Sequence, residues 1–181
     1  YDLTVPFARY VAQHQNELTF PFRRYQIQPV WRADRPQHGR FQEVYQCDAD
    51  IVGDRSLWQE VEVLALYDKA FSDLKIEGVS LKVNHRKILA GIAGKLGAEE
   101  RLIDFTIALD KLDKIGKEGV FEELKSKGFN AGALQLLEEL LSLQGTASEQ
   151  LDVLKSILAD QPEGIKGIEE LEFIFNQFND N

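Results

Sequence analysis

The stretch from residue 25 to residue 53 constrains the fold of this chain more than any other. Two runs rich in aromatic and β-branched residues flank the short segment 35–40, which contains Pro36 and Gly39. Proline and glycine mark turns, and two such runs joined by a short turn-forming segment are typical of a β-hairpin. The sequence therefore predicts a long antiparallel hairpin with an irregular tip.

Alternation along the two strands sorts their side chains onto two faces. One face carries charged and amide side chains among valines: Gln28, Val30, Arg32, Asp34, Val44, Gln46, Asp48, Asp50 and Val52. The other face of the second strand carries an apolar set, which we expect to be core: Tyr45, Cys47, Ala49 and Ile51. Polar groups on strands need partners. The polar face is therefore either a solvated sheet surface with cross-strand ion pairs or the floor of a site for a polar ligand, with arginines placed for phosphate.

Charge is distributed unevenly along the 181 residues. The net charge of −9 disfavours a general nucleic-acid binder that relies on bulk positive charge. Residues 1–55 hold seven arginines, no lysine and seven acidic residues, so the excess of acid lies entirely in residues 56–181. Arginine without lysine suits fixed bidentate recognition, whereas lysine-rich helices suit solvated faces. Chance in a short segment is the alternative explanation.

The single cysteine, the scattered histidines and the absence of long apolar runs exclude several classes of protein. Cys47 is the single cysteine, so neither a disulfide framework nor a cysteine-based zinc site is expected. His14, His38 and His85 match no metal-ligand spacing, and we expect no metal held by protein side chains. No signal peptide or apolar run near 18 residues is present, which indicates a cytoplasmic protein without a membrane span.

Helical periodicity dominates the rest of the chain. Residues 1–6 lead into a helix for which Thr4 is the expected N-cap, with an apolar stripe of Val5, Ala8, Val11 and Ala12. After the hairpin we expect a helix at 56–75, a strand at 79–83 and a helix at 84–96. Beyond them the spacing predicts helices at about 98–115, 117–127, 130–143, 147–159 and 163–178.

The composition changes near Gly97, which we take as a domain boundary. An α/β piece with arginine and aromatic residues precedes it, and an acidic, leucine-rich helical bundle follows it. The expected domains are therefore residues 1–97 and residues 98–181. Lys111, Lys114 and Lys117 form a basic run in the second domain, which either meets phosphate or forms i,i+3 ion pairs on a solvated face.

Several separated segments resemble, in the same order, the histidyl-tRNA synthetase family of class II aminoacyl-tRNA synthetases. The segments are YDLTVPFARY (1–10), the hairpin from 24 to 53, KVNHRKILAG (82–91) and LDKLDK (109–114). The hairpin corresponds to the signature called motif 2. The resemblance implies an α+β fold: a partial class II antiparallel sheet with flanking helices in 1–97, followed by an all-helical insertion bundle in 98–181.

The implied activity is the ATP-dependent activation of histidine and its transfer to histidine tRNA. The family uses ATP with Mg²⁺, contacts the tRNA acceptor arm and forms homodimers. No match to its motif 1, its motif 3 or its anticodon-binding domain occurs in the chain, so we expect a piece of a longer ligase that is inactive alone. The alternative is a non-catalytic paralogue, acting as a histidine-binding regulatory subunit or as a sensor of uncharged tRNA.

The resemblance also implies roles for residues around the amino acid. Arg32 corresponds to the catalytic arginine of motif 2, which bridges the α-phosphate of ATP and the carboxylate of histidine. Asp2, Thr4 and Gln46 correspond to the groups around the α-ammonium, although Asp2 and Thr4 can equally serve as helix caps. Asp50 corresponds to the acid that accepts a hydrogen bond from the N–H of the imidazole ring.

Around ATP and tRNA, the resemblance implies a second set of residues. Asp34 corresponds to the acid near the adenine amino group, and Arg40 to the arginine facing the outer phosphates. Val44 stands where the family has a phenylalanine that stacks on adenine, and Gln42 stands where it has an arginine. The loop residues Gln37 and His38 correspond to positions that meet the acceptor end of the tRNA.

Overall fold

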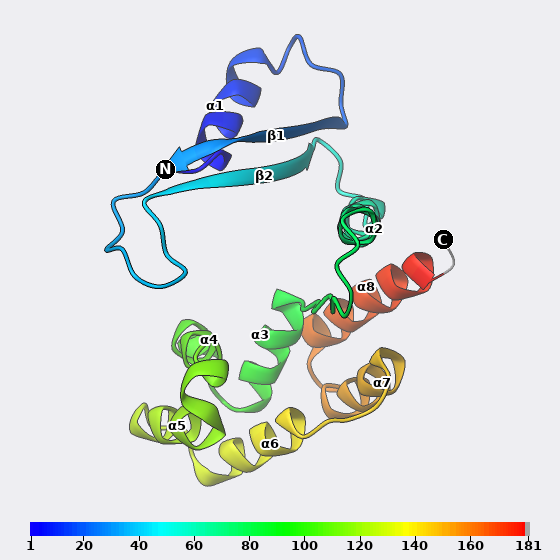
Figure 1. Ribbon diagram of the computed structural model, residues 1–181. Coiled ribbons are helices and arrows are strands. Elements are labelled where there is room, and N and C mark those ends of the chain that lie inside the picture. The colour runs from blue at the N-terminus through cyan, green and yellow to red at the C-terminus, as the bar shows by residue number, and fades with distance from the viewer. Residues whose placement is uncertain (180–181) are drawn as a thin grey trace. The chain divides into compact units, whose positions relative to one another are not determined.

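The computed structural model describes residues 1–179 and forms two compact units, which divide between Ala70 and Phe71. The first contains α1 (Thr4–His14), β1 (Phe22–Trp31), β2 (Glu43–Val52) and most of α2 (Trp58–Asp73). The second is helical in its described part (Figure 1). The fold class is therefore α+β, as predicted. The units divide before the composition change at Gly97, and the assignment of 1–97 and 98–181 as functional domains stays a prediction.

Strands β1 and β2 form the predicted antiparallel hairpin. Their register pairs Phe22 with Val52 at one end and Trp31 with Glu43 at the other. Over these ten pairs the strands keep strict alternation, so even-numbered side chains share one face and odd-numbered side chains share the other. The two sets defined from the sequence are therefore real faces of the sheet.

The tip of the hairpin is a tight turn beyond a short irregular stretch. The Arg32 amide donates to the Gln42 carbonyl at 2.8 Å, which extends the ladder by one bond. Gln37 and Arg40 then exchange two backbone hydrogen bonds of 3.2 and 2.9 Å. Gly39 lies between them with a φ of +74°, a conformation that glycine adopts at little cost.

The prediction of which face is core was wrong. Tyr45 is 73% exposed, and Cys47 and Ala49 are exposed as well, while Ile51 is half-buried. The even-numbered face is instead the more covered one, where Val30 is 3% exposed. Alternation identifies the side chains that share a face, but it does not decide which face receives the neighbouring helix, because a polar face can be covered once its groups find partners.

Helix α1 begins differently from the prediction. Leu3, not Thr4, occupies the N-cap position, and no side chain caps the helix there. The Asp2 carboxylate accepts a long hydrogen bond from the Val5 amide, at 3.5 Å. Thr4 is the first helical residue and its side chain is exposed. Thr4 therefore leaves its hydroxyl free of the capping role that the sequence suggested.

The apolar stripe of α1 was also wrongly predicted. Of its four expected members, Val5, Ala8 and Ala12 are exposed and Val11 is only half-buried. Phe7 instead stacks on Phe22, with ring centroids 6.3 Å apart. Leu3, just before the helix, is 2% exposed. The Tyr10 ring, one turn further along, also lies 6.5 Å from the Phe22 ring, so the contact with the sheet is made by Leu3, Phe7 and Tyr10.

Helix α2 is attached to the outer side of the hairpin by an ion pair. Arg23 donates to both oxygens of Glu62, from Nε at 2.7 Å and from Nη2 at 2.8 Å. The helix starts after Ser56, whose hydroxyl accepts from the Trp58 amide at 3.3 Å. Val61 faces inward and is 4% exposed. This arginine pair serves the fold on the odd-numbered side of β1, opposite the polar face.

The second unit consists of α3 (Arg86–Lys95), η1 (Glu99–Arg101), α4 (Leu102–Leu109), α5 (Leu112–Ser126), α6 (Ala131–Leu141), α7 (Ala147–Ile157) and α8 (Pro162–Asn179). The predicted strand at 79–83 is absent, because a strand needs a neighbour for its backbone and no described segment pairs with these residues. The predicted helix at 98–115 is divided after Leu109, and Gly116 interrupts α5 with a φ of 72°.

Close backbone contact joins α3 to α8. A Cβ placed on Gly91 would lie 2.7 Å from the Cα of Gly164, so the helices approach through glycine. Gly167 similarly faces Ile88. The second unit buries a core of large apolar side chains that includes Phe105, Leu124, Leu158 and Ile168. The leucines predicted as core thus do face inward, at Leu124 and Leu158 among others.

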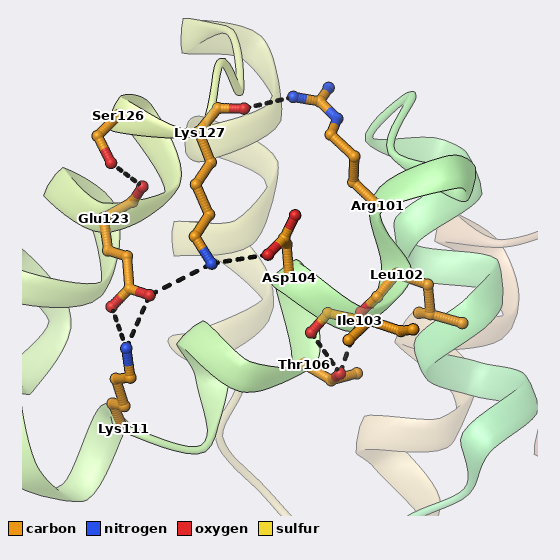
Figure 2. Close-up of polar contacts among 9 residues, drawn as sticks. All are labelled: Arg101, Leu102, Ile103, Asp104, Thr106, Lys111, Glu123, Ser126 and Lys127. Carbon is orange, nitrogen blue, oxygen red and sulfur yellow. Dashed lines mark hydrogen bonds and ion pairs between the residues drawn. The ribbon is translucent and has the colours of Figure 1, made fainter.

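A charge network joins α4 to α5 (Figure 2). Lys127 Nζ lies 3.0 Å from Asp104 and 3.4 Å from Glu123, and Lys111 Nζ lies 2.8 Å from Glu123. Arg101 adds a 2.6 Å hydrogen bond to the Lys127 carbonyl. These contacts hold the pKa of Glu123 below its usual range, chiefly through the hydrogen bond from Lys111. Lys111, the N-cap residue of α5, therefore pairs with Glu123 beyond the break at Gly116 rather than at i,i+3.

Candidate functional site

The even-numbered face of the hairpin gathers most of the side chains expected to form a site. We call this surface the polar face and define it by Arg24, Gln26, Gln28, Val30, Arg32, Val44, Gln46, Asp48 and Asp50. The strand register places Gln28 opposite Gln46 and Arg24 opposite Asp50. Polar groups from both strands are therefore neighbours, as cross-strand pairs are.

The N-terminal residues lie against the polar face. The Tyr1 carbonyl accepts from Arg32 Nε at 3.2 Å, and the Leu3 carbonyl accepts from Arg24 Nη2 at 3.4 Å. Asp2 lies between these two anchored residues, and Thr4 follows them. The structure therefore brings Asp2 and Thr4 to the same side of the sheet as the hairpin residues with which the sequence analysis grouped them.

Arg32 combines an anchored end with a free fork. Its Nε is held by Tyr1, and its guanidinium carbon lies 5.5 Å from the centroid of the Tyr1 ring. Within the described residues, neither of its Nη groups makes a hydrogen bond. A planar guanidinium with unused donors is suited to bind carboxylate or phosphate oxygens in pairs.

Asp34 and Arg40 lie together beyond the strands. Arg40 Nε is 3.2 Å from Asp34 Oδ2, and the Gln42 side chain donates to the Asp34 carbonyl at 3.2 Å. The family resemblance implies that these two residues contact opposite ends of a nucleotide, and here they form an ion pair with each other. Gln37 and His38 are exposed in the turn that brings the chain back to Arg40.

Three buried polar atoms on the polar face lack a hydrogen bond within the described residues: Arg24 Nε, Gln46 Oε1 and Asp50 Oδ2. Asp50 Oδ2 does form an ion pair with Arg24 Nη2 at 2.7 Å, but its angles are not those of a hydrogen bond. Buried polar atoms are nearly always hydrogen-bonded in native proteins, so a group of exceptions needs an explanation. Two of the three are acceptors on β2, which a ligand with N–H donors would satisfy.

Arg24 also lies on the polar face, although it is not among the site residues that the family resemblance implies. Its parity along β1 assigns it to the polar face together with Gln28 and Arg32, and that signal was available from the sequence. Its partner was not available, because pairing with Asp50 depends on the register of the two strands. Nothing in the spacing of the two residues alone indicates that they meet.

The fold is that of a class II aminoacyl-tRNA synthetase. A crystal structure of histidyl-tRNA synthetase from Nostoc sp. PCC 7120 superposes with a TM-score of 0.90 at 31% identity, over 99% of this chain and 42% of that one. The chain belongs to the histidyl-tRNA synthetase family: the family profile described as Histidyl-tRNA synthetase matches residues 1–181.

Curated relatives agree with this assignment. A histidine–tRNA ligase from Christiangramia forsetii is 60% identical over 97% of this chain, and one from Flavobacterium johnsoniae is 58% identical over 99%. The chain spans about two-fifths of their lengths, 39% and 38% respectively. A structure from Bacillus halodurans C, titled as an ATP phosphoribosyltransferase regulatory subunit/histidyl-tRNA synthetase, shares the fold with a TM-score of 0.75 at 23% identity.

The polar face offers groups suited to a nucleotide and an amino acid. The free fork of Arg32 is suited to phosphate, and the unsatisfied acceptors are suited to an amino acid. Among the side chains of residues 1–179 that the structure describes, no group of three or more His, Cys, Asp or Glu is placed to hold a metal ion. Nor does any helix in that range have the length and apolar character to cross a membrane.

Proposed function

We propose that this chain supplies the motif 2 hairpin and the helical insertion of an enzyme that activates histidine with ATP and transfers it to histidine tRNA. The observation that carries the proposal is the polar face, where an arginine fork with unused donors lies on the same sheet surface as two buried acceptors without hydrogen bonds. Family membership supplies the reaction to which these groups are suited.

In the proposed reaction, a carboxylate oxygen of histidine attacks the α-phosphorus of ATP and pyrophosphate leaves. Arg32 binds the attacking carboxylate and the α-phosphate together, which aligns them and neutralises charge that grows in the transition state. The terminal ribose hydroxyl of the tRNA then attacks the activated carbonyl and AMP leaves. Mg²⁺, where bound, adds further neutralisation at the phosphates.

The amino acid is proposed to lie over β2. Its α-ammonium has three donors, to which Gln46 Oε1, Asp2 and Thr4 offer acceptors. Asp50 accepts the imidazole N–H, which distinguishes histidine from side chains of similar size but without that donor. The missing hydrogen bonds of Gln46 and Asp50 support this placement, because a ligand with two separate N–H donors supplies both.

The nucleotide is proposed to lie toward the tip of the hairpin. Asp34 serves the adenine amino group, Arg40 the outer phosphates and Val44 the adenine ring. Separating the Asp34–Arg40 pair costs little free energy, because Arg40 is 57% exposed and exposed ion pairs contribute little to stability in water. Gln37 and His38, exposed at the turn, are proposed to meet the acceptor end of the tRNA. By family membership, the full-length protein is proposed to be a cytoplasmic homodimer.

A second candidate function is a non-catalytic relative that binds histidine as a regulatory subunit or senses uncharged tRNA. Two observations favour it: Val44 and Gln42 replace the aromatic residue and the arginine of the family pattern, and the Bacillus halodurans C structure, whose title includes a regulatory subunit, has the same fold.

The experiment that separates the two candidates is histidine-dependent exchange of labelled pyrophosphate into ATP by the full-length protein. The enzyme gives exchange well above a no-histidine blank. A regulatory relative binds histidine in a calorimeter and gives no exchange. A protein that does neither, and that does not bind uncharged histidine tRNA, contradicts both candidates.

A further inference from the structure

We propose that Arg24 is a positioning residue that holds Asp50 in place for the imidazole of histidine, and that it thereby sets the selectivity for a side chain with a ring N–H. This inference rests on the proposed function, because it concerns the same pocket. It adds a residue for which neither the motif pattern nor the sequence analysis assigned a role.

The first support is the pairing itself. Arg24 and Asp50 are directly opposite in the strand register, and Nη2 of the arginine lies 2.7 Å from Oδ2 of the carboxylate. The Arg24 side chain is 11% exposed and the Asp50 side chain is 28% exposed. Removing one partner of an ion pair at this depth leaves the other charge poorly solvated, so the pair is expected to act as a unit.

The second support is that Arg24 is fixed by contacts on its other sides. Its Nη1 donates to Gln26 at 2.7 Å, its Nη2 donates to the Leu3 carbonyl at 3.4 Å, and its guanidinium carbon lies 4.1 Å from the centroid of the Phe7 ring. Gln26 in turn donates to Gln28 at 2.9 Å. An arginine held at a ring face and by two acceptors can position the carboxylate it pairs with.

The third support is the hydrogen bonding left unmet at the pair. The ion pair does not satisfy Asp50 Oδ2 as a hydrogen-bond acceptor. Oδ2 is itself enclosed and held by charge, so the oxygen that remains for a ligand is Oδ1, which makes no hydrogen bond to a described residue on a side chain that is 28% exposed. A ring N–H donates to this oxygen, whereas a ring without a donor leaves the acceptor unpaired and is rejected. Without Arg24, the Asp50 carboxylate would rotate more freely, which would weaken this discrimination.

Arg23 provides a matched control on the same strand. It also forms an arginine–carboxylate pair, with Glu62 at 2.7 Å, but on the opposite face of β1. Arg23→Gln and Arg24→Gln thus each remove one arginine pair of the hairpin, and only the second touches the polar face. Arg24→Lys keeps the charge but loses the fork.

The test measures binding of histidine and of 2-thiazolylalanine, whose ring has no N–H, by calorimetry on the full-length protein. We expect Arg24→Gln to reduce the preference for histidine over the analogue by at least about tenfold. Asp50→Asn should do the same, and the double variant should add little further loss. ATP affinity should stay within about twofold, Arg23→Gln should keep the parental preference, and Arg24→Lys should keep part of it.

Histidine binding by the parent protein distinguishes a failure of this inference from a failure of the proposed function. If the parent protein binds no histidine, the proposed function is wrong and this inference falls with it. If the parent binds histidine and Arg24→Gln weakens both ligands equally, or behaves like Arg23→Gln, then Arg24 only supports the sheet. Arg24→Lys decides the matter if Arg24→Gln does not fold, because a purely structural arginine would leave its preference unchanged.

Discussion

At the scale of the residue, Arg32 is the group on which the proposed chemistry depends most. One nitrogen of its guanidinium is held by the Tyr1 carbonyl, while the fork is free to bind oxygens. We expect Arg32→Ala in the full-length protein to lose two charge-assisted contacts of about 1.5–3 kcal/mol each, and therefore at least about 100-fold in the rate of adenylation. Pyrophosphate exchange at saturating substrates measures this rate.

The control for Arg32 is Arg35→Ala, which removes an exposed arginine from the loop a few residues later. It should leave the rate close to that of the parent. If the exchange rate of Arg32→Ala stays within about threefold of the parental rate, Arg32 does not contact the reacting groups, because losing two charge-assisted contacts would slow the reaction far more.

Val44 is a second residue whose substitution should have a measurable effect. It is half-buried and lies opposite Val30, which is 3% exposed. An aromatic ring there would stack on adenine, and base–aromatic stacking contributes about 1–3 kcal/mol. Val44→Phe in the full-length protein should then tighten ATP binding by roughly 3- to 30-fold, while histidine binding hardly changes.

Calorimetric titration of ATP into both forms distinguishes the alternatives for Val44. Weaker binding by Val44→Phe would indicate that the pocket has repacked around valine and that the larger ring clashes. Absence of ATP binding by either form would favour the regulatory relative.

At the scale of the element, the contact between α3 and α8 depends on the absence of a side chain. A Cβ on Gly91 would meet backbone atoms of Gly164 at 2.7 Å, and backbone cannot yield as a flexible side chain can. We expect Gly91→Ala to destabilise the second unit by about 1–3 kcal/mol, in spite of the better helix propensity of alanine. Urea unfolding followed by circular dichroism measures the change.

Gly132→Ala is the matched helical control. Its added Cβ would meet only the Asn130 side chain at 3.5 Å, which is an ordinary contact. This variant should be neutral or slightly stabilising. Equal destabilisation by both substitutions would contradict the close approach of α3 and α8.

The elements that the sequence predicted well are those whose pattern is local. Periodicity and turn residues predicted the hairpin and most helices, with ends displaced by a few residues. The strand expected at 79–83 failed because strand formation depends on a neighbour, which no local pattern reveals. The cover of the polar face by the residues around Leu3 and Phe7 is likewise a tertiary fact, and so is the Arg24–Asp50 pair. Motif identity supplied the candidate site residues, whose roles stay predictions, whereas the Arg24–Asp50 pairing required the strand register.

At the scale of the whole molecule, acidic groups paired with lysine link stability to pH. The pKa of Glu170 is lowered from its usual value of 4.5, first by the hydrogen bond from Lys87. The pKa values of Glu123 and Asp160 are lowered by their lysine partners as well. A folded-state pKa below that of the unfolded chain contributes stability above about pH 4.5, which is lost as pH falls through the folded value.

The melting temperature of the chain should therefore fall as pH is lowered from 5 to 3, and Glu170→Gln should make that fall shallower. Glu122→Gln, at an exposed residue without an ion pair among the described residues, serves as the control and should keep the parental slope. A parental slope in Glu170→Gln would mean that its pair with Lys87 contributes nothing to folding. Raising the salt concentration should weaken the dependence in every form.

The strict alternation of the hairpin also limits how its length can change in evolution. Inserting or deleting one residue within a strand would exchange the two faces on one side of that point. A change in β1 between Ile27 and the tip, for example, would turn Tyr25 and Ile27 onto the polar face and Arg24 away from Asp50. The same change between residues 33 and 41 alters only the tip. Viable differences in length among descendants of this hairpin should therefore accumulate at the tip, so the part proposed to meet the tRNA can diversify while the proposed amino acid pocket keeps its frame.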